Sequence, residues 1–131
     1  MRYLLTIYED ESRSATMTPE DGARIMEGYG KFGQAVEAAG AFVAGAGLQP
    51  TRTATTVRVR DGERLITDGP FAETKEQLGG FYLLECKDLD EAIEWAAKIP
   101  GAQGGSIEVR PEMDYEAMQA SQPSAAGATE A

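Results

Sequence analysis

Histidine is absent from the 131 residues of the chain, and Cys86 is its one cysteine. Without histidine, no imidazole can act as a general base, a proton shuttle or a metal ligand. One cysteine cannot form an intrachain disulfide or a thiolate zinc site. Because Cys86 lies in an apolar run, we expect a buried thiol in a reducing cytoplasm. The sequence therefore predicts neither a metal site nor a bound cofactor.

Long apolar runs and positive charge are also scarce. No run is long enough to cross a membrane, and residues 1–5 lack the apolar core and cleavage site of a signal peptide. Lys and Arg number 12 against 22 Asp and Glu, which gives a formal net charge of −10. Nucleic acids and anionic membranes attract cationic surfaces, so this charge disfavours both as partners. The length fits one domain, which we expect to be cytoplasmic because of its lone thiol.

Turn and capping residues divide the chain into short elements. Thr18 is typical of a helix N-cap, Pro19 of the first helical position and Gly40 of a helix end. Asp61-Gly62 favours a two-residue turn between strands, because such a turn needs positive φ angles. The predicted strands span residues 2–8, 41–48, 54–60, 63–67, 80–86 and 106–110. The predicted helices span 19–39 and, from an N-cap at Asp88 or Asp90, the residues up to Ile99.

The spacing of apolar residues predicts which side chains are buried. In the first helix the predicted stripe contains Ile25, Tyr29, Phe32 and Val36. In the second helix it contains Leu89, Ala92, Ile93, Ala96 and Ile99. The strand 54–60 alternates, so Val57 and Val59 are expected to point inward. Apolar residues occur on both faces of the strands 2–8 and 80–86, which indicates a sheet that is covered on both sides.

The order of the elements predicts an α+β fold, a ferredoxin-like βαββαβ arrangement with an added β-hairpin. Such a sheet carries both helices on one face, and its other face would be too apolar for water. The side chains expected on that face are Leu4 or Tyr3, Val57, Tyr82 and Leu84. We therefore expect a homodimer in which two sheets face each other. The domain is expected to span 1–118, followed by a disordered C-terminal tail, 119–131.

The segment 61–82, DGERLITDGPFAETKEQLGGFY, is dense in turn residues and mixed charge. Asp68 can accept backbone N–H bonds, Gly69 permits unusual φ angles and Pro70 fixes the next step. Phe71 is expected to anchor this turn in the core. Asp68 has two interpretations, a turn cap or a site carboxylate, whereas the pattern of the other three residues favours a structural turn.

Five polar residues, 73–77, follow this turn. They either line the rim of a pocket, with Lys75 binding an anion and Glu73 or Glu76 acting as a base, or form a solvated helical turn. Gly79-Gly80 would let another backbone approach closely just before the next strand.

Arg110 ends the last strand, where it could pair with Asp68, Glu73 or a ligand carboxylate, or form a purely structural ion pair. The ligand-binding candidates are Asp68, Gly69, Pro70, Phe71, Glu73, Lys75, Glu76 and Arg110. The candidates for a catalytic base are Asp68 and Glu76.

The opening MRYLLTIY, the Asp-Gly-Pro-Phe run, the strand GGFYLLE and the closing IEVRP together resemble the YCII-related family. The resemblance covers Met1 to Glu112 and points to the branch named after the tetrapeptide (the DGPF domain). It implies a dimeric α/β barrel. The family-defining positions are Asp68, Gly69, Pro70, Phe71, Glu73, Lys75, Glu76, Gly79, Gly80 and Phe81. A better studied branch carries a His-Asp pair, which cannot be transferred to a chain without histidine.

Three functions are open at this point. The first is a homodimer that binds a small anionic or polar molecule in a pocket beside the DGPF loop. The second is a regulatory protein, because the resemblance implies genes that often lie beside those of extracytoplasmic-function sigma factors. The third is a cofactor-free enzyme with Asp68 or Glu76 as its base, which requires one of these carboxylates to be buried.

Overall fold

The computed structural model describes residues 1–121 of the chain. Most of the expected tail, 119–131, lies outside the described residues, and residues 119–121 belong to a helix. Within the described part, no helix is both long and apolar enough to span a membrane.

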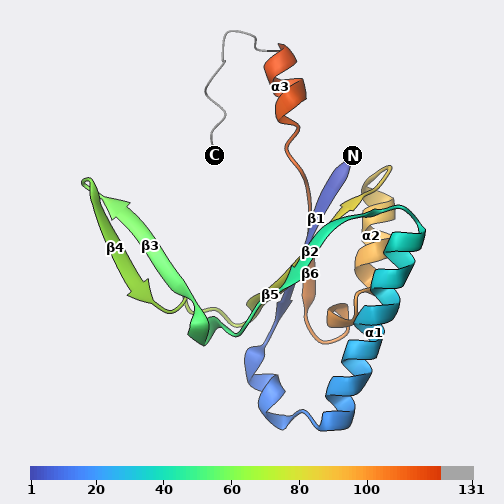
Figure 1. The fold of residues 1–131 in the computed structure, drawn as a ribbon, viewed down its shortest axis with the longest axis horizontal. Helices are drawn as coiled ribbons and strands as arrows, with labels where there is room; N and C mark the ends of the chain where they lie inside the picture. The colour runs from blue at the N-terminus through green and yellow to red at the C-terminus, as the bar shows by residue number, and fades with distance from the viewer. Residues whose placement is uncertain (122–131) are drawn as a thin grey trace.

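Six strands, three α-helices and three short 3₁₀ helices follow one another in residues 1–121 (Figure 1). The strands are β1 (Arg2–Glu9), β2 (Phe42–Gly47), β3 (Thr55–Arg60), β4 (Glu63–Asp68), β5 (Gln77–Glu85) and β6 (Ser106–Pro111). The α-helices are α1 (Pro19–Ala38), α2 (Leu89–Lys98) and α3 (Tyr115–Ser121). The 3₁₀ helices are η1 (Glu11–Thr16), η2 (Thr51–Thr53) and η3 (Pro100–Ala102). Each predicted strand and helix is present, and β5 begins three residues before the predicted strand.

Four strands form an antiparallel sheet in the order β2-β5-β1-β6, and β3 and β4 form a separate two-stranded sheet. The fold is α+β. In this sheet α1 connects β1 to β2 and α2 connects β5 to β6, which is consistent with the expected ferredoxin-like arrangement. Figure 1 shows α1 and α2 against one face of the sheet, while the β3–β4 hairpin projects away on the other side.

The helix boundaries follow from local capping, as predicted. Thr18 caps α1 in a capping box, in which its hydroxyl accepts the N–H of Asp21 and the Asp21 carboxylate accepts the N–H of Thr18. Gly40 follows α1 with a φ of 71°, a left-handed angle that glycine adopts easily. Of the two candidates for the second cap, Asp88 is the one that accepts the N–H of Glu91.

The core lies between the two long helices and the covered face of the sheet. Phe32 of α1 packs against Tyr82 with ring centroids 4.9 Å apart and edge-on against Trp95 at 5.9 Å. The buried apolar residues are Tyr3, Leu5, Ile7, Phe32, Val36, Ala41, Leu84, Cys86, Ala92, Ala96 and Ile99. The thiol of Cys86 is buried and free, as predicted, and burial raises its pKa.

Three of the predicted core positions in the helices are wrong. Leu89 and Ile93 of α2 are 49% and 50% exposed, and Ile25 of α1 is 38% exposed. The buried face of α2 runs through Ala92 and Ala96. At about 100° per residue, Leu89 and Ile93 are turned by about 60° and 100° from Ala92 in the same direction, so both lie toward one edge of that face.

The β3–β4 hairpin confirms the turn prediction and corrects the core prediction. Asp61 and Gly62 have φ angles of 53° and 80°, both positive as a type I′ turn requires. Val57 and Val59 do not point into the core, since they are 56% and 59% exposed. The reason is that the hairpin leaves the body of the domain instead of joining its sheet.

The second face of the main sheet is open within residues 1–121. Its residues include Leu4, Thr6 and Tyr8 of β1, Phe81 and Leu83 of β5, and Ala44 and Ala46 of β2. The members from β1 and β5 are only partly buried. The prediction for Leu4 is confirmed. Tyr3, Tyr82 and Leu84 instead face the helices. The strand register places Tyr3 opposite Leu84, and Tyr82 opposite the buried Leu5.

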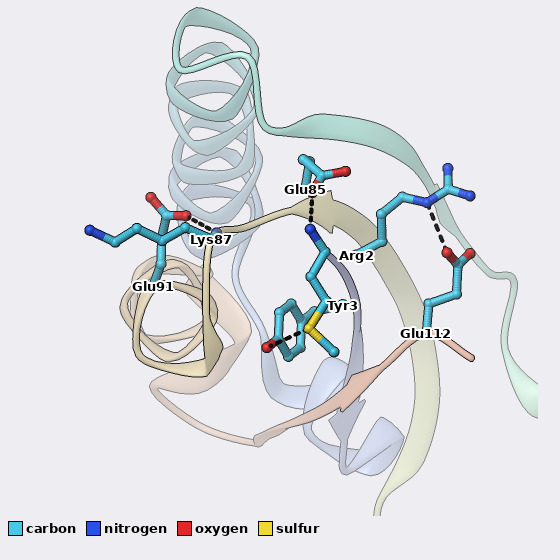
Figure 2. Close-up of polar contacts among 7 residues, drawn as sticks. Arg2, Tyr3, Glu85, Lys87, Glu91 and Glu112 are labelled. Atoms are coloured by element: carbon cyan, nitrogen blue, oxygen red, sulfur yellow. Dashed lines mark hydrogen bonds and ion pairs between the residues drawn. The ribbon is translucent and has the colours of Figure 1, made fainter. Parts of the chain in front are cut away.

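The start of β1 is tied to both neighbouring strands (Figure 2). The Met1 ammonium group pairs with Glu85 at the end of β5, and Arg2 Nε donates to Glu112 Oε1 at 2.8 Å beside the end of β6. The Tyr3 hydroxyl contacts the Met1 sulfur at 3.4 Å. Exposed pairs of this kind contribute little free energy each, so they mainly keep the strand ends in register.

Replacing Leu84 with Ala is expected to lower the free energy of unfolding by about 3 kcal/mol, because the truncation leaves a cavity at a fully buried site. The matched control is Leu89→Ala, where a half-exposed side chain is shortened and the expected loss is below about 1 kcal/mol. Urea denaturation followed by circular dichroism measures both variants. Equal losses would contradict the burial difference between the two leucines.

Candidate ligand-binding cleft

A cleft of about 1050 Å³ opens at the end of the sheet where β1 finishes and β5 starts. Its walls come from η1, the start of α1, and the segments 48–52 and 100–104. Gln77 and Gly79 also line it, so the cleft borders the second half of the segment 61–82. A recess of this size can hold a small metabolite.

Hydrogen bonds fix η1 as one wall of this cleft. Asp10 Oδ1 accepts the N–H of Ser12 at 2.9 Å and its hydroxyl at 2.7 Å. The Glu11 carboxylate accepts the N–H and the hydroxyl of Thr51 at 2.9 and 2.7 Å. The N–H of Glu11 in turn donates to Gln77 Oε1 at 2.9 Å. Glu11 therefore joins η1, η2 and β5, and both carboxylates are engaged in structural contacts.

The pKa of Asp10, which lines the cleft, is affected by Lys75, one of the candidates from the sequence. Hydrogen bonds from Ser12 are the main cause that holds the pKa of Asp10 below its ordinary value, and the charges of Arg13 and Lys75 contribute less. Lys75 does not line the cleft, but its ammonium group is close enough to act on a carboxylate that does.

Three arginines line the cleft, and two of them have no carboxylate within ion-pair distance. Arg24 pairs with Asp21. Arg13 Nη1 donates to the neutral carbonyl oxygen of Gly104 at 2.6 Å. The guanidinium of Arg52 has no ion pair among residues 1–121. Among residues 1–121, Arg52 and Arg13 thus have no ion pair, although the charge of Arg13 acts on Asp10 more weakly than the Ser12 hydrogen bonds do, and both can bind another anion.

Gly101, a buried residue of η3, forms the floor of the cleft. A Cβ at this position would lie 2.9 Å from both Ile7 Cγ2 and the Tyr29 hydroxyl oxygen, and 3.1 Å from Glu9 Oε2. Burial, helped by the charge of Glu9, raises the pKa of Tyr29 to about 12. Tyr29 is thus a neutral hydroxyl beside a carboxylate at physiological pH.

The Asp-Gly-Pro-Phe turn lies at the root of the hairpin, outside the residues that line the cleft. Gly69 has a φ of 101°, its N–H donates to the Ala54 carbonyl oxygen at 2.7 Å, and its own carbonyl oxygen accepts the Thr56 hydroxyl at 2.8 Å. Asp68 is exposed. Phe71 is 76% exposed, so the prediction that it anchors the turn in the core is wrong. The chain between β4 and β5 runs outside the packed layers, where no core is available.

The remaining sequence candidates lie at separate places. Glu76 Oε1 accepts the hydroxyl of Ser106 at 3.0 Å. Arg110 lies 3.4 Å from Glu108 in an exposed ion pair on its own strand, and not beside the carboxylates that the sequence offered as partners. Glu73 and Lys75 are exposed, whereas Gly69 and Pro70 are partly buried. None of the eight ligand-binding candidates lines the cleft, although Lys75 acts on it.

Sequence reasoning missed Arg13 and Arg52, which lie in segments interpreted only as loops. The pattern Asp10-Glu11-Ser12 is a local cap signal that could have revealed η1. The contact of Glu11 with Thr51 joins residues 40 positions apart, so no local pattern reveals it. Within residues 1–121, no three metal-binding side chains lie together.

Comparison with known proteins gives two matches. Residues 1–116 match the family described as the YCII-related domain. An uncharacterized protein of Rhizobium meliloti (strain 1021) is 42% identical over 113 residues, which covers 85% of this chain and 91% of that protein. The family match includes the sheet, the two helices packed on it and every residue of the cleft.

Replacing Gly101 with Ala is expected to lower the free energy of unfolding by about 1–3 kcal/mol, because the new Cβ overlaps Ile7 and the Tyr29 hydroxyl. The matched control is Gly30→Ala in α1, where a Cβ meets nothing within 4 Å. The Gly30→Ala change is expected to raise the free energy of unfolding by about 0.5–1 kcal/mol. If urea denaturation shows that both replacements change the free energy of unfolding in the same direction, Gly101 is not packed as described.

Tyr29 is expected to lose its proton near pH 12, above the ordinary tyrosine value of 10. The folded protein favours the neutral form, so this contribution to stability is complete below pH 10 and is lost as the pH rises toward 12. The ¹³C shift of the Tyr29 ring measures the titration, and Tyr29→Phe removes the same component from the stability profile. A normal tyrosine titration at this residue would disprove its burial against Glu9.

Proposed function

The chain belongs to the YCII-related family, and on that premise we propose that it is a homodimer that binds a small anionic molecule in the cleft. The observation that supports this function best is the presence of Arg13 and Arg52 in a recess of about 1050 Å³ without a carboxylate partner. A guanidinium group that no protein carboxylate neutralises favours an anionic ligand.

The acidic residues of the cleft do not remove this preference. Asp10 and Glu11 receive hydrogen bonds from protein N–H and hydroxyl groups, and Asp21 pairs with Arg24. Glu9 lies at the floor, beside the Tyr29 hydroxyl. The guanidinium groups of Arg13 and Arg52, which have no ion pair among residues 1–121, are therefore the cationic groups that an anion in the cleft could bind.

The chemistry favours a carboxylate or a phosphate as the ligand group. The planar guanidinium of arginine matches both with two parallel hydrogen bonds. The charge of Lys75, one cation of the segment 61–82, acts weakly on Asp10. The cleft takes the place of the pocket predicted beside the DGPF loop, since Gln77 and Gly79 border it and the Asp-Gly-Pro-Phe turn lies outside its lining.

The homodimer follows from the open sheet face. Leu4, Phe81 and Leu83 are only partly buried there, and a covering surface would remove their apolar area from water. At about 25 cal/mol per Å², a few hundred Å² contribute several kcal/mol to association. Two copies with these faces toward each other would form the dimeric α/β barrel that the family resemblance implies.

A regulatory protein with a partner such as an extracytoplasmic-function sigma factor is the second candidate. The 76% exposure of Phe71 favours it, because exposed aromatic side chains are common in protein interfaces. The cofactor-free enzyme has less support, since Asp68 is exposed and Glu76 is only partly buried.

Inorganic phosphate or succinate is expected to raise the melting temperature of the wild type by a few degrees at constant ionic strength, because a ligand of the folded state stabilises it. Arg52→Gln is expected to lose more than half of this increase. Arg60→Gln, at the exposed tip of the hairpin, is the matched control and should respond like the wild type. An equal loss in both variants, or no response in the wild type, would contradict the proposed site.

A further inference from the structure

The β3–β4 hairpin, residues 55–68, forms an arm that stands apart from the main sheet. The register of the arm pairs Val57 with Ile66 and Val59 with Arg64. Because opposite residues of paired strands share a face, Val57, Val59 and Ile66 lie together at the centre of one face of the arm, which has Arg64 toward its tip and Asp68 at its root. We call this the apolar face of the arm. Its three apolar side chains are 56%, 59% and 60% exposed, so residues 1–121 leave that face in water.

The arm is held at its root and not along its length. The bonds of Gly69 to Ala54 and Thr56, at 2.7 and 2.8 Å, close the root. Figure 1 shows the rest of the arm projecting from the body, on the side of the sheet opposite to α1 and α2. A two-stranded hairpin without a third strand or a helix against it is only marginally stable in water. A surface beyond residues 1–121 would therefore stabilise the arm.

We propose that the arm is a dimerisation arm, whose apolar face packs on the part of a second copy's open sheet face that the facing sheet of the barrel leaves uncovered. This inference rests on the homodimer proposed above and deepens it by naming the element that makes the contact. The receiving surface contains Leu4, Phe81 and Leu83 of the open sheet face. The arm projects on the side of the sheet away from α1 and α2 (Figure 1).

A second copy fits better than a foreign partner because one chain carries both surfaces. In a two-fold dimer each copy supplies an arm to the other and receives one in return, so both apolar surfaces are covered in a single association. The six-residue strands of the arm span about 20 Å, and a four-stranded sheet is about 15 Å wide. One arm is therefore long enough to cross the face of its partner.

The size of the contact also suits a stable dimer. The three exposed apolar side chains of this face amount to roughly 250 Å², a patch of a few hundred Å². Two arms and two receiving surfaces of the same size would bury roughly 1,000 Å² in total, which reaches the lower limit of a specific interface before the sheet contact is added.

The distribution of charge favours the arm as the point of approach. The arm carries three cationic and three anionic side chains, which are Arg58, Arg60 and Arg64 and Asp61, Glu63 and Asp68. Its net charge is therefore zero, and the formal charge of −10 lies entirely on the rest of the chain. Two acidic bodies repel each other, and a neutral arm approaches such a body with the least repulsion.

An armless variant tests the proposal directly. The arm is replaced by Asn-Gly, a two-residue turn that joins Ala54 to Gly69, which are already hydrogen-bonded neighbours. Sedimentation equilibrium over the micromolar range measures the dissociation constant, and circular dichroism checks the fold. The wild type is expected to be a dimer and the folded armless variant a monomer.

Point variants give a matched comparison within the arm. Val57→Asp places a charge on the apolar face, and Thr67→Asp places the same charge on the opposite, exposed face. We expect Val57→Asp to weaken dimerisation at least about tenfold, because it places a charge in an apolar contact, and Thr67→Asp to change it less than about threefold. If the armless variant does not fold, the difference between Val57→Asp and Thr67→Asp decides whether the arm mediates dimerisation.

Cross-linking identifies the receiving surface. Because Cys86 is buried, a Val57→Cys variant offers its new thiol to a photoreactive maleimide. When the labelled Val57→Cys variant is mixed with wild-type chain that carries a different tag, cross-links are expected to join the arm of the labelled chain to β1 or β5 of the tagged chain.

The outcomes separate this inference from the function on which it rests. A monomeric wild type overturns both the homodimer and the arm. A dimeric wild type with unchanged dissociation constants in the armless and Val57→Asp variants overturns the arm alone. Cross-links confined to the labelled chain also overturn it. A monomeric armless variant, a weaker Val57→Asp dimer and intermolecular cross-links to the sheet support it.

Discussion

The alternation of side chains along β1 determines where most other parts of the protein lie. β1 is a central strand, paired with β5 on one side and β6 on the other. Tyr3, Leu5 and Ile7 therefore point into the core under the helices, and Leu4 and Thr6 point to the open face. A shift of one residue would bury Thr6 and expose Leu5. The register of one strand thus fixes both the core and the surface proposed to meet a second copy.

The cleft depends on the same strand at its other end. β1 ends at Glu9 and leads into η1, where Glu11 holds Thr51 of η2 and Gln77 of β5. One side chain thereby joins three segments into a wall. Arg52 lies in η2, a few residues before β3 begins, so the cleft and the arm share a short piece of backbone. Docking of the arm on a second copy would also fix the segment that presents Arg52.

The errors of sequence interpretation occur mainly at the apolar residues that the chain leaves exposed. Val57, Val59 and Phe71 have the composition of core residues, yet each is more than half exposed. An apolar pattern shows that a side chain favours burial, but not which surface covers it. In the helices the errors are smaller, since Leu89 and Ile93 lie toward one edge of a correctly predicted buried face.

The sequence by itself determined the six strands, α1 and α2, the hairpin turn and the α+β fold class, because capping, turn and periodicity signals act over a few residues. It also pointed to the segment 61–82, and the second half of that segment borders the cleft. Only the tertiary structure decided that Arg13 and Arg52 face a common recess. Their segments, with 100–104, lie far apart in the chain, and strand pairing and the Glu11 contacts bring them together. No local pattern encodes a distance between such segments.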